Sequence, residues 1–169
     1  MNNQLRPQSV KQLFGMAIAI ELTAADFYDS LSQRFAHEVD VSDFWHQLSL
    51  DEKAHAAALE NARDRLTAET LAQSPDDQLA RRVVEAHRQI DGLTAAPINT
   101  LDDAYELAHD IEFSEVNAIF KVLATEMVPV ETHRQFVLDQ IETHQKRLLT
   151  FGAAFGDRAW RRQVRARML

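Results

Sequence analysis

The chain has 169 residues, a length that suits a single domain (residues 1–169) able to bury a substantial core. It contains no Cys, which excludes disulfides, thiolate zinc sites and iron–sulfur clusters and leaves His and carboxylate side chains as potential metal ligands. The net charge of −8 argues against nucleic acid as the main partner. Gly and Pro occur only four times each, which favours an all-α fold.

The two ends of the sequence differ in charge and neither is strongly apolar. Residues 1–9 are polar, and no apolar run approaches the roughly 20 residues of a membrane span, so we expect a soluble, cytoplasmic protein without membrane association. Residues 153–169 form a tail in which Arg is frequent. We expect a short basic C-terminal helix here, lying against the acidic remainder of the chain or a second subunit; binding to acidic lipid or another partner is the alternative.

Two long amphipathic helices are predicted in the first half of the chain. The first begins near Ser9, which forms a capping box with Gln12, and the second runs from about Val41 to Thr70. Apolar residues recur every three or four positions in both, as in helices that pack into a bundle. The inward stripes are Phe14, Ala17, Glu21, Ala24, Tyr28, Leu31 and Phe35 in the first helix, and Val41, Phe44, Leu48, Glu52, His55, Leu59, Ala62 and Leu66 in the second.

A crossover and a second pair of helices follow. Ser74-Pro75-Asp76-Asp77 predicts a helix start, so residues 76–91 are expected to be helical within a crossover that spans residues 73–99. Thr100 and Asp103 cap a third long helix, and a fourth runs over about residues 130–151. Their inward stripes are Tyr105, Ala108, Glu112, Glu115, Ile119 and Leu123, then Val137, Ile141, His144, Leu148 and Phe151.

Ionisable residues interrupt all four inward stripes near their centres. The clearest case is Glu52 with His55, one helical turn apart on the face where the neighbouring residues are apolar. This Glu-x-x-His pattern supplies metal ligands in di-iron carboxylate bundles, although it also arises by chance in exposed helices. Carboxylates are rarely buried without a partner, and four of them in one layer would repel each other. Two divalent cations would neutralise four carboxylates, and two imidazoles would complete the ligand set.

The second helical pair departs from the pattern of the first. The two pairs align as an internal repeat, in which Glu52-x-x-His55 corresponds to Ile141-x-x-His144. Ile141 therefore stands where the repeat predicts a Glu, and Glu142 lies roughly opposite His144 around its helix. We interpret Ile141 as a lost ligand, and Glu115 as a second carboxylate from the third helix that fills the gap.

These features resemble the rubrerythrin group of the ferritin-like superfamily. The resemblance covers roughly residues 9–151 and rests on Glu21 with the later Phe27-Tyr28, on Glu52-x-x-His55, on Glu112-x-x-Glu115 and on the crossover. It implies a ferritin-like four-helix bundle (residues 9–152) with a non-haem di-iron centre that reacts with peroxide or oxygen. The ligands that it implies are Glu21, Glu52, His55, Glu112, Glu115 and His144, with the four Glu as catalytic groups. Many rubrerythrins also have a rubredoxin domain. Because the sequence contains no Cys, we expect that domain to be absent and an external electron donor, rubredoxin-like or other, to be used.

Several other residues have two interpretations. Tyr28 and Tyr105 either donate hydrogen bonds to ligand carboxylates or are core aromatics. Asp51 either orients a ligating His or forms a salt bridge, and we favour the salt bridge. His109 lies at the edge of its stripe and is a minor candidate ligand. The residues expected on the surface are His37, His46, His87 and His133.

Three functions are compatible with the sequence. The leading hypothesis is an oxidoreductase with two divalent metal ions, iron first and zinc or manganese as alternatives. The second is an iron-handling ferroxidase, and the third is a bundle whose degenerate site holds a structural metal, for which Ile141 is the main support. We expect a homodimer, because two-fold assemblies are common.

Overall fold

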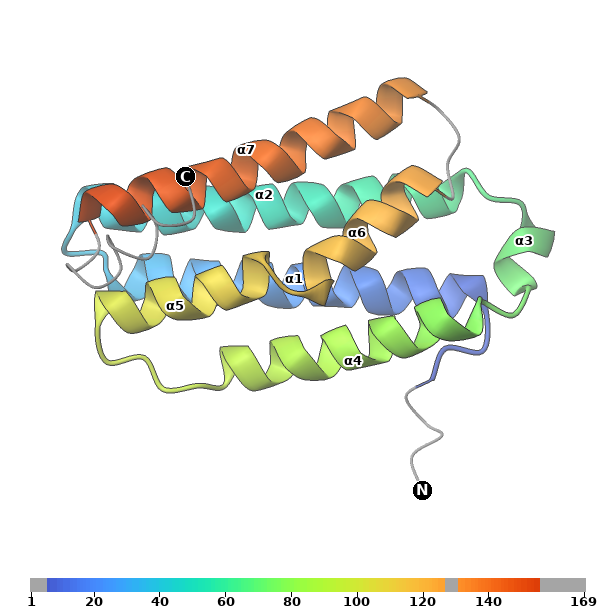
Figure 1. Cartoon of the computed structure of the whole chain (residues 1–169), viewed down its shortest axis with the longest axis horizontal. Coiled ribbons are helices and arrows are strands. Elements are labelled where there is room, and N and C mark those ends of the chain that lie inside the picture. Colours follow the sequence, from blue (N-terminus) through green and yellow to red (C-terminus); the bar gives the residue numbers. More distant parts are fainter. Residues whose placement is uncertain (1–5, 127–130, 156–169) are drawn as a thin grey trace.

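The structure, a computed structural model, describes residues 6–126 and 131–155. Within these ranges every regular element is a helix (Figure 1), which confirms the all-α prediction. The described helices are α1 (Val10–Arg34), α2 (Val39–Asp64), α3 (Ala68–Ala72), α4 (Asp77–Thr94), α5 (Leu101–Glu112), α6 (Glu115–Glu126) and α7 (Glu131–Phe155). The predicted C-terminal basic helix lies outside the described residues.

The long helices lie side by side (Figure 1). α1 and α2 form an antiparallel pair, and α7 packs against α2 and α6. α4 returns the chain along α1 and α6, so that α2 and the α5–α6 segment run in the same direction. α4 matches the segment 76–91 that the sequence predicted to be helical. The second predicted helix is shorter than expected: α2 ends at Asp64, and α3 is separate.

Polar side chains cap four of the described helix starts. Ser9 caps α1, Thr67 caps α3, Asp76 caps α4, and Thr100 with Asp103 forms the predicted capping box of α5. These side chains accept hydrogen bonds from N–H groups that have no partner inside the helix. α2 begins at Val39, two residues before the predicted start, and no side chain makes a capping hydrogen bond there.

The core is rich in aromatic side chains. The largest fully buried residues include Trp45, Tyr28, Tyr105, Phe14 and Phe120. Each buries a large apolar area, and these rings therefore dominate the hydrophobic stabilisation of the fold. Two of these rings lie against buried ionisable side chains: Tyr28 beside His144 and Phe120 beside His55.

The third long helix is split, whereas the sequence predicted one continuous stripe. α5 ends at Glu112, and α6 begins two residues later. No Gly or Pro occurs at this point, so no local signal marked the break. The side chains of Ser114 and Gln145 donate hydrogen bonds to the carbonyl oxygens of Ile111 (2.7 Å) and Glu112 (3.2 Å). They satisfy carbonyls near the end of α5, and Gln145 connects this end to α7.

The Gln145→Leu variant should be less stable than the natural protein by about 1 kcal/mol, because the carbonyl of Glu112 loses a hydrogen bond. Urea denaturation measures this difference. Gln135→Leu is the matched control, because Gln135 is exposed on the same helix. Equal midpoints for the two variants would contradict a stabilising role of the Gln145 contact.

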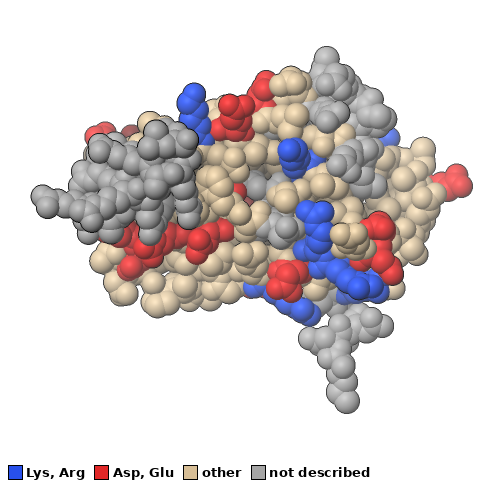
Figure 2. Space-filling view, viewed as in Figure 1, with Lys and Arg blue, Asp and Glu red and all other residues tan. Residues whose placement is uncertain are grey.

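The surface carries charges of both signs. On the face shown in Figure 2, acidic side chains gather near the left end of α5, and basic side chains are more frequent towards α4 and α6. Within the described ranges, no helix combines the length and the apolar character that crossing a membrane requires.

Candidate metal centre

Five of the six predicted ligands lie together in the core. They come from four helices, and each residue is at most 3% exposed. These residues are Glu21 from α1, Glu52 and His55 from α2, Glu112 from α5 and His144 from α7. The sixth, Glu115, is the first residue of α6, and its side chain lies outside the described part of the chain.

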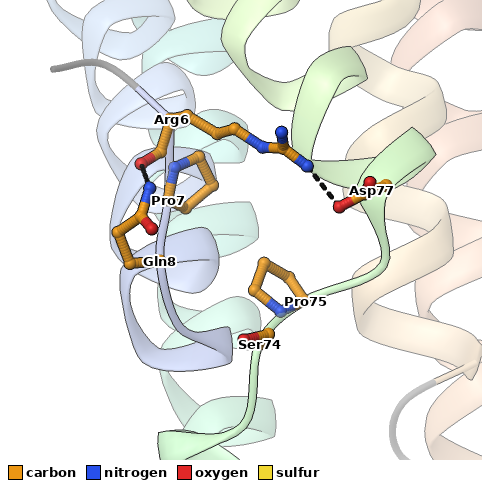
Figure 3. A pocket seen from close by; sticks show the side chains of 6 residues that line it. All are labelled: Arg6, Pro7, Gln8, Ser74, Pro75 and Asp77. Atoms are coloured by element: carbon orange, nitrogen blue, oxygen red, sulfur yellow. Dashed lines mark hydrogen bonds and ion pairs between the residues drawn. The ribbon is translucent and has the colours of Figure 1, made fainter. Parts of the chain in front are cut away.

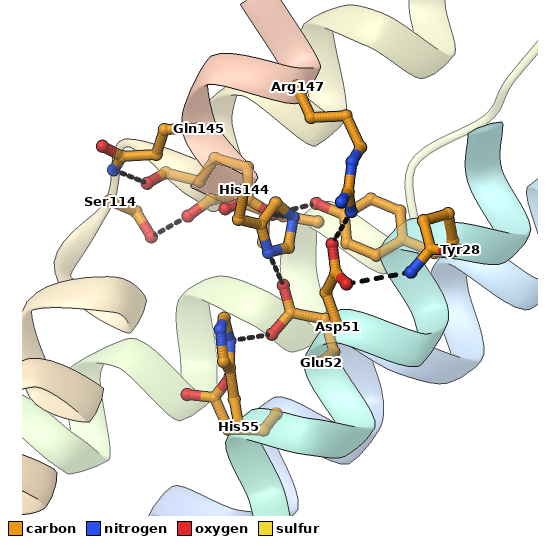
Figure 4. Close-up of polar contacts among 12 residues, drawn as sticks. Tyr28, Asp51, Glu52, His55, Ser114, His144, Gln145 and Arg147 are labelled. Carbon is orange, nitrogen blue, oxygen red and sulfur yellow. Dashed lines mark hydrogen bonds and ion pairs between the residues drawn. The ribbon is translucent and has the colours of Figure 1, made fainter. Parts of the chain in front are cut away.

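Glu52 lies between two imidazoles (Figure 4). Its Oε2 atom is 3.0 Å from Nδ1 of His55, and its Oε1 atom is 3.6 Å from Nδ1 of His144. One potential ligand atom from each of these three residues lies within 4.8 Å of the others. This spacing is compatible with one metal ion held by all three side chains.

Each imidazole also contacts a second carboxylate. Nδ1 of His55 is 3.6 Å from Oε2 of Glu21, and Nε2 of His144 is 3.1 Å from Oε1 of Glu112. The order along the cluster is therefore Glu21, His55, Glu52, His144 and Glu112, with carboxylates and imidazoles alternating. We call this set the carboxylate–imidazole row.

Four buried atoms of the row have no hydrogen-bond partner within the described residues. They are Oε2 of Glu21, Nε2 of His55 and both ring nitrogens of His144. Oε2 of Glu21 and the two His144 nitrogens lie at ion-pair distance from neighbouring groups of the row, but these contacts lack hydrogen-bond geometry. A buried polar atom without a hydrogen bond costs on the order of 1–3 kcal/mol. Metal ions would give these atoms a partner, and mixed carboxylate and imidazole donors suit iron, manganese and zinc. The residues present therefore fit a metal centre.

Without metal, protons partly neutralise the row. Burial raises the pKa of Glu52 to about 8, although the charge of His55 opposes this shift. Burial alone would lower the pKa of His55, but the charge of Glu52 and contacts with Glu21 outweigh it and raise that pKa to about 11. The pKa of His144 is raised in the same way, because Glu112 and Glu52 outweigh the effect of burial. A metal ion must therefore displace protons to bind here.

The surroundings of the row restrict water and hold its helices in place. The ring of Phe120 stacks on His55 with the ring centres 4.4 Å apart. Tyr28 donates a 2.7 Å hydrogen bond to Oε1 of Glu112 and is also a fully buried core aromatic. Its burial and the nearby Glu112 raise the pKa of the Tyr28 hydroxyl well above its usual value, so the phenol stays protonated.

An ion pair between Asp51 and Arg147 links α2 to α7 beside the row (Figure 4). The sequence analysis favoured a salt bridge for Asp51 but did not identify its partner. Asp51 precedes Glu52, and Arg147 follows His144 by one helical turn, so opposite charges next to the two motifs were the available signal.

The remaining candidates lie outside the row. Ile141 packs against the hydrophobic core and Glu142 is exposed, so the structure adds neither side chain to the row. Nδ1 of His109 is 3.6 Å from Asp110, and its ring stacks on Phe113. Of the four histidines expected on the surface, His37 and His46 are exposed, His87 is partly exposed, and His133 lies outside the residues whose side chains are described.

Two pockets open at other places. One of about 230 Å³ lies where the chain enters α1 and α4, and its charged residues Arg6 and Asp77 pair with each other (Figure 3). This pairing leaves it without a preference for a charged ligand. Another of about 550 Å³ is lined by His109, Phe113 and Ser114, among others. Because Phe113 directly follows Glu112, this pocket adjoins the backbone at one end of the row.

Comparison of the chain with protein-family models, with curated proteins and with solved structures found no match. The functional argument therefore rests on the geometry and chemistry of the row.

Proposed function

We propose that this chain is a non-haem di-metal protein with a ferritin-like, rubrerythrin-like four-helix bundle. It holds two divalent metal ions, for which iron is the leading candidate, and it reacts with peroxide or oxygen using electrons from an external donor. The observation that carries the proposal is the position of Glu52 between two buried imidazoles, each of which contacts a further carboxylate. The shared direction of α2 and the α5–α6 segment, with α4 between them in the chain, supports the bundle.

The row divides into two halves that share Glu52. Glu21 and His55 would hold one ion, and His144 and Glu112 the other. The His144 half lacks the carboxylate that Ile141 replaces, and Glu115 is the residue that we assign to this gap. Bound iron would supply electrons for the reduction of peroxide or oxygen. The chain's own residues do the rest: Phe120 shields His55, and Tyr28 orients Glu112.

The alternative to a di-metal redox centre is a site that holds a single structural ion, and a specific observation favours it. Glu52, His55 and His144 alone bring three ligand atoms within 4.8 Å of one another. Ile141 removes a ligand from the same region. Such a site would stabilise the fold through binding to the native state, without redox turnover.

Anaerobic titration with Fe²⁺, followed by metal analysis, separates these functions. We expect two ions per chain in the natural protein, and one or fewer in His144→Ala, because that variant removes the nitrogen donor of one half. His46→Ala is the matched control, since the His46 side chain is 55% exposed on α2. One ion per chain in the natural protein would favour the structural site. No bound ion would exclude both proposals.

A further inference from the structure

Both tyrosines of the chain lie against the same tryptophan. The sequence contains two Tyr and two Trp. The ring centre of Trp45 is 6.1 Å from that of Tyr28, with the planes 11° apart, and 4.9 Å from that of Tyr105. All three residues are fully buried. Trp160 lies outside the described residues, so the described Tyr and Trp side chains form one continuous group.

The inner end of this group touches the carboxylate–imidazole row. The Tyr28 hydroxyl donates to Glu112, which in turn contacts His144. The ring centres of Tyr28 and His144 are 6.4 Å apart. An electron that leaves Tyr28 therefore starts next to the proposed metal centre, and the proton of the phenol has an acceptor in Glu112.

The outer end lies near one end of the molecule. Tyr105 belongs to the first two turns of α5, and this helix begins at the same end as the α1–α2 turn (Figure 1). Burial raises the pKa of the Tyr105 hydroxyl, and the nearby acids Glu38 and Asp102 raise it further. The side chain of Glu38 is 52% exposed. Tyr105 is thus buried close to an acidic side chain that is itself exposed to solvent.

The chemistry of these residues suits single-electron transfer. Trp, Tyr and Cys lose an electron more readily than other side chains, and this chain has no Cys. Electron transfer weakens steeply with distance, so short steps between rings in contact are faster than one long step. The Nε1 atom of Trp45 has no hydrogen-bond partner among the described residues. None of the described residues accepts the proton of an oxidised Trp45, which regains its electron from a tyrosine.

We propose that Tyr28, Trp45 and Tyr105 form a relay that carries single electrons between the surface near the start of α5 and the carboxylate–imidazole row. The oxidant that draws electrons through the relay is hydrogen peroxide, which is reduced at the row. This part of the inference rests on the proposed function. Reduction of one peroxide to two water molecules consumes two electrons and two protons from solvent, so the relay operates twice for each peroxide.

Each pass restores the relay. Tyr28 gives up one electron and transfers its hydroxyl proton to Glu112. Trp45 then returns an electron to Tyr28, which takes back its proton. Tyr105 returns an electron to Trp45 and releases its hydroxyl proton to solvent on the side of Glu38 and Asp102. A one-electron donor of the iron–sulfur or flavin class finally reduces Tyr105, which takes up a proton from solvent.

A laser-flash experiment on the metal-free protein tests electron transfer within the relay. In Trp160→Phe, Trp45 is the only tryptophan, so an ultraviolet flash ionises it selectively. We expect the absorbance of the tryptophan radical to decay as that of a tyrosyl radical grows, at a rate independent of protein concentration.

Variants show which rings take part. Tyr28→Phe and Tyr105→Phe should each lower the yield of the tyrosyl radical. Trp45→Phe with Trp160 intact gives the reference signal without Trp45. Phe44→Leu is the packing control, because Phe44 contacts Trp45 but is not readily oxidised. Decay without a tyrosyl radical would overturn the relay.

A second experiment tests the connection to the row. Iron-loaded protein receives peroxide without an electron donor, and electron paramagnetic resonance and peptide mass spectrometry locate the oxidised residues. We expect a tyrosyl radical and oxidation products at the three relay residues, reduced at Tyr105 at least tenfold in Trp45→Phe. Bound iron with unmodified relay residues would overturn the inference. If no iron binds, the proposed function is wrong, and so is the proposal that peroxide reduced at the row oxidises the relay. The flash experiment alone then decides whether the three rings exchange electrons.

Discussion

The Glu52→Gln variant should bind fewer than one metal ion per chain, where we expect the natural protein to bind two. Within the described residues Glu52 contacts both His55 and His144, so it is the carboxylate that both halves of the row share. Gln keeps the shape of the side chain but removes its negative charge and places an N–H donor against the imidazoles. Loss of an outer partner of a ligand already costs 10–100-fold in metal affinity, so loss of a shared ligand should cost at least about 100-fold. Metal analysis after dialysis against defined free metal measures this change.

Glu60→Gln is the matched control for this variant. Glu60 lies on the same helix, about two turns beyond Glu52, and is exposed. The Glu60→Gln variant should bind as many metal ions per chain as the natural protein does. Two ions per chain in Glu52→Gln would show that this carboxylate is not a ligand, and the proposed centre would then be wrong.

The metal-free protein should lose stability as the pH rises from about 5 to about 9. The folded protein raises the pKa of Glu52 from its ordinary value of 4.5 to about 8, and that of His55 from 6.5 to about 11. Between these limits the folded chain holds protons that the unfolded chain has released. The contribution to stability is therefore fully present below the unfolded pKa values and is lost as the pH rises through the folded ones. The slope is on the order of 1 kcal/mol per pH unit for each retained proton.

Urea denaturation at pH 5.5, 7 and 8.5, with a chelator present, measures this slope. Glu52→Gln should flatten it, since one of the retained protons is then absent. A metal-free protein that is more stable at pH 8.5 than at pH 5.5 would contradict the protonated row.

Bound metal should reverse the trend, because metal displaces the protons and binds more tightly as the pH rises. At a free metal concentration 100 times the Kd, one site stabilises the native state by about 2.7 kcal/mol. For a domain of this size that corresponds to a rise in Tm of roughly 5–10 °C.

Periodicity was sufficient to predict which ionisable groups face inward. Glu21, Glu52, His55 and His144 occur at intervals of three and four residues among apolar side chains, and this spacing places them on one face of each helix whatever the partners are. Local start signals predicted the helical segment that became α4 and the pairing of Thr100 with Asp103, because a helix cap is a contact between residues close in sequence.

The break between Glu112 and α6 could not be predicted in the same way. It lacks Gly and Pro, and it is stabilised by Gln145, a residue 33 positions away in the sequence. The ion pair between Asp51 and Arg147 spans 96 positions. Such contacts depend on how the helices are rotated and shifted against each other, which local periodicity does not determine.

The sequence by itself determined the helical class and the inward direction of the ionisable residues, because both follow from the local repeat of the α-helix. Only the tertiary structure decided the order of the carboxylate–imidazole row and the contact of both tyrosines with Trp45. These depend on distances between side chains from different helices, and those distances are set by the packing of the whole core.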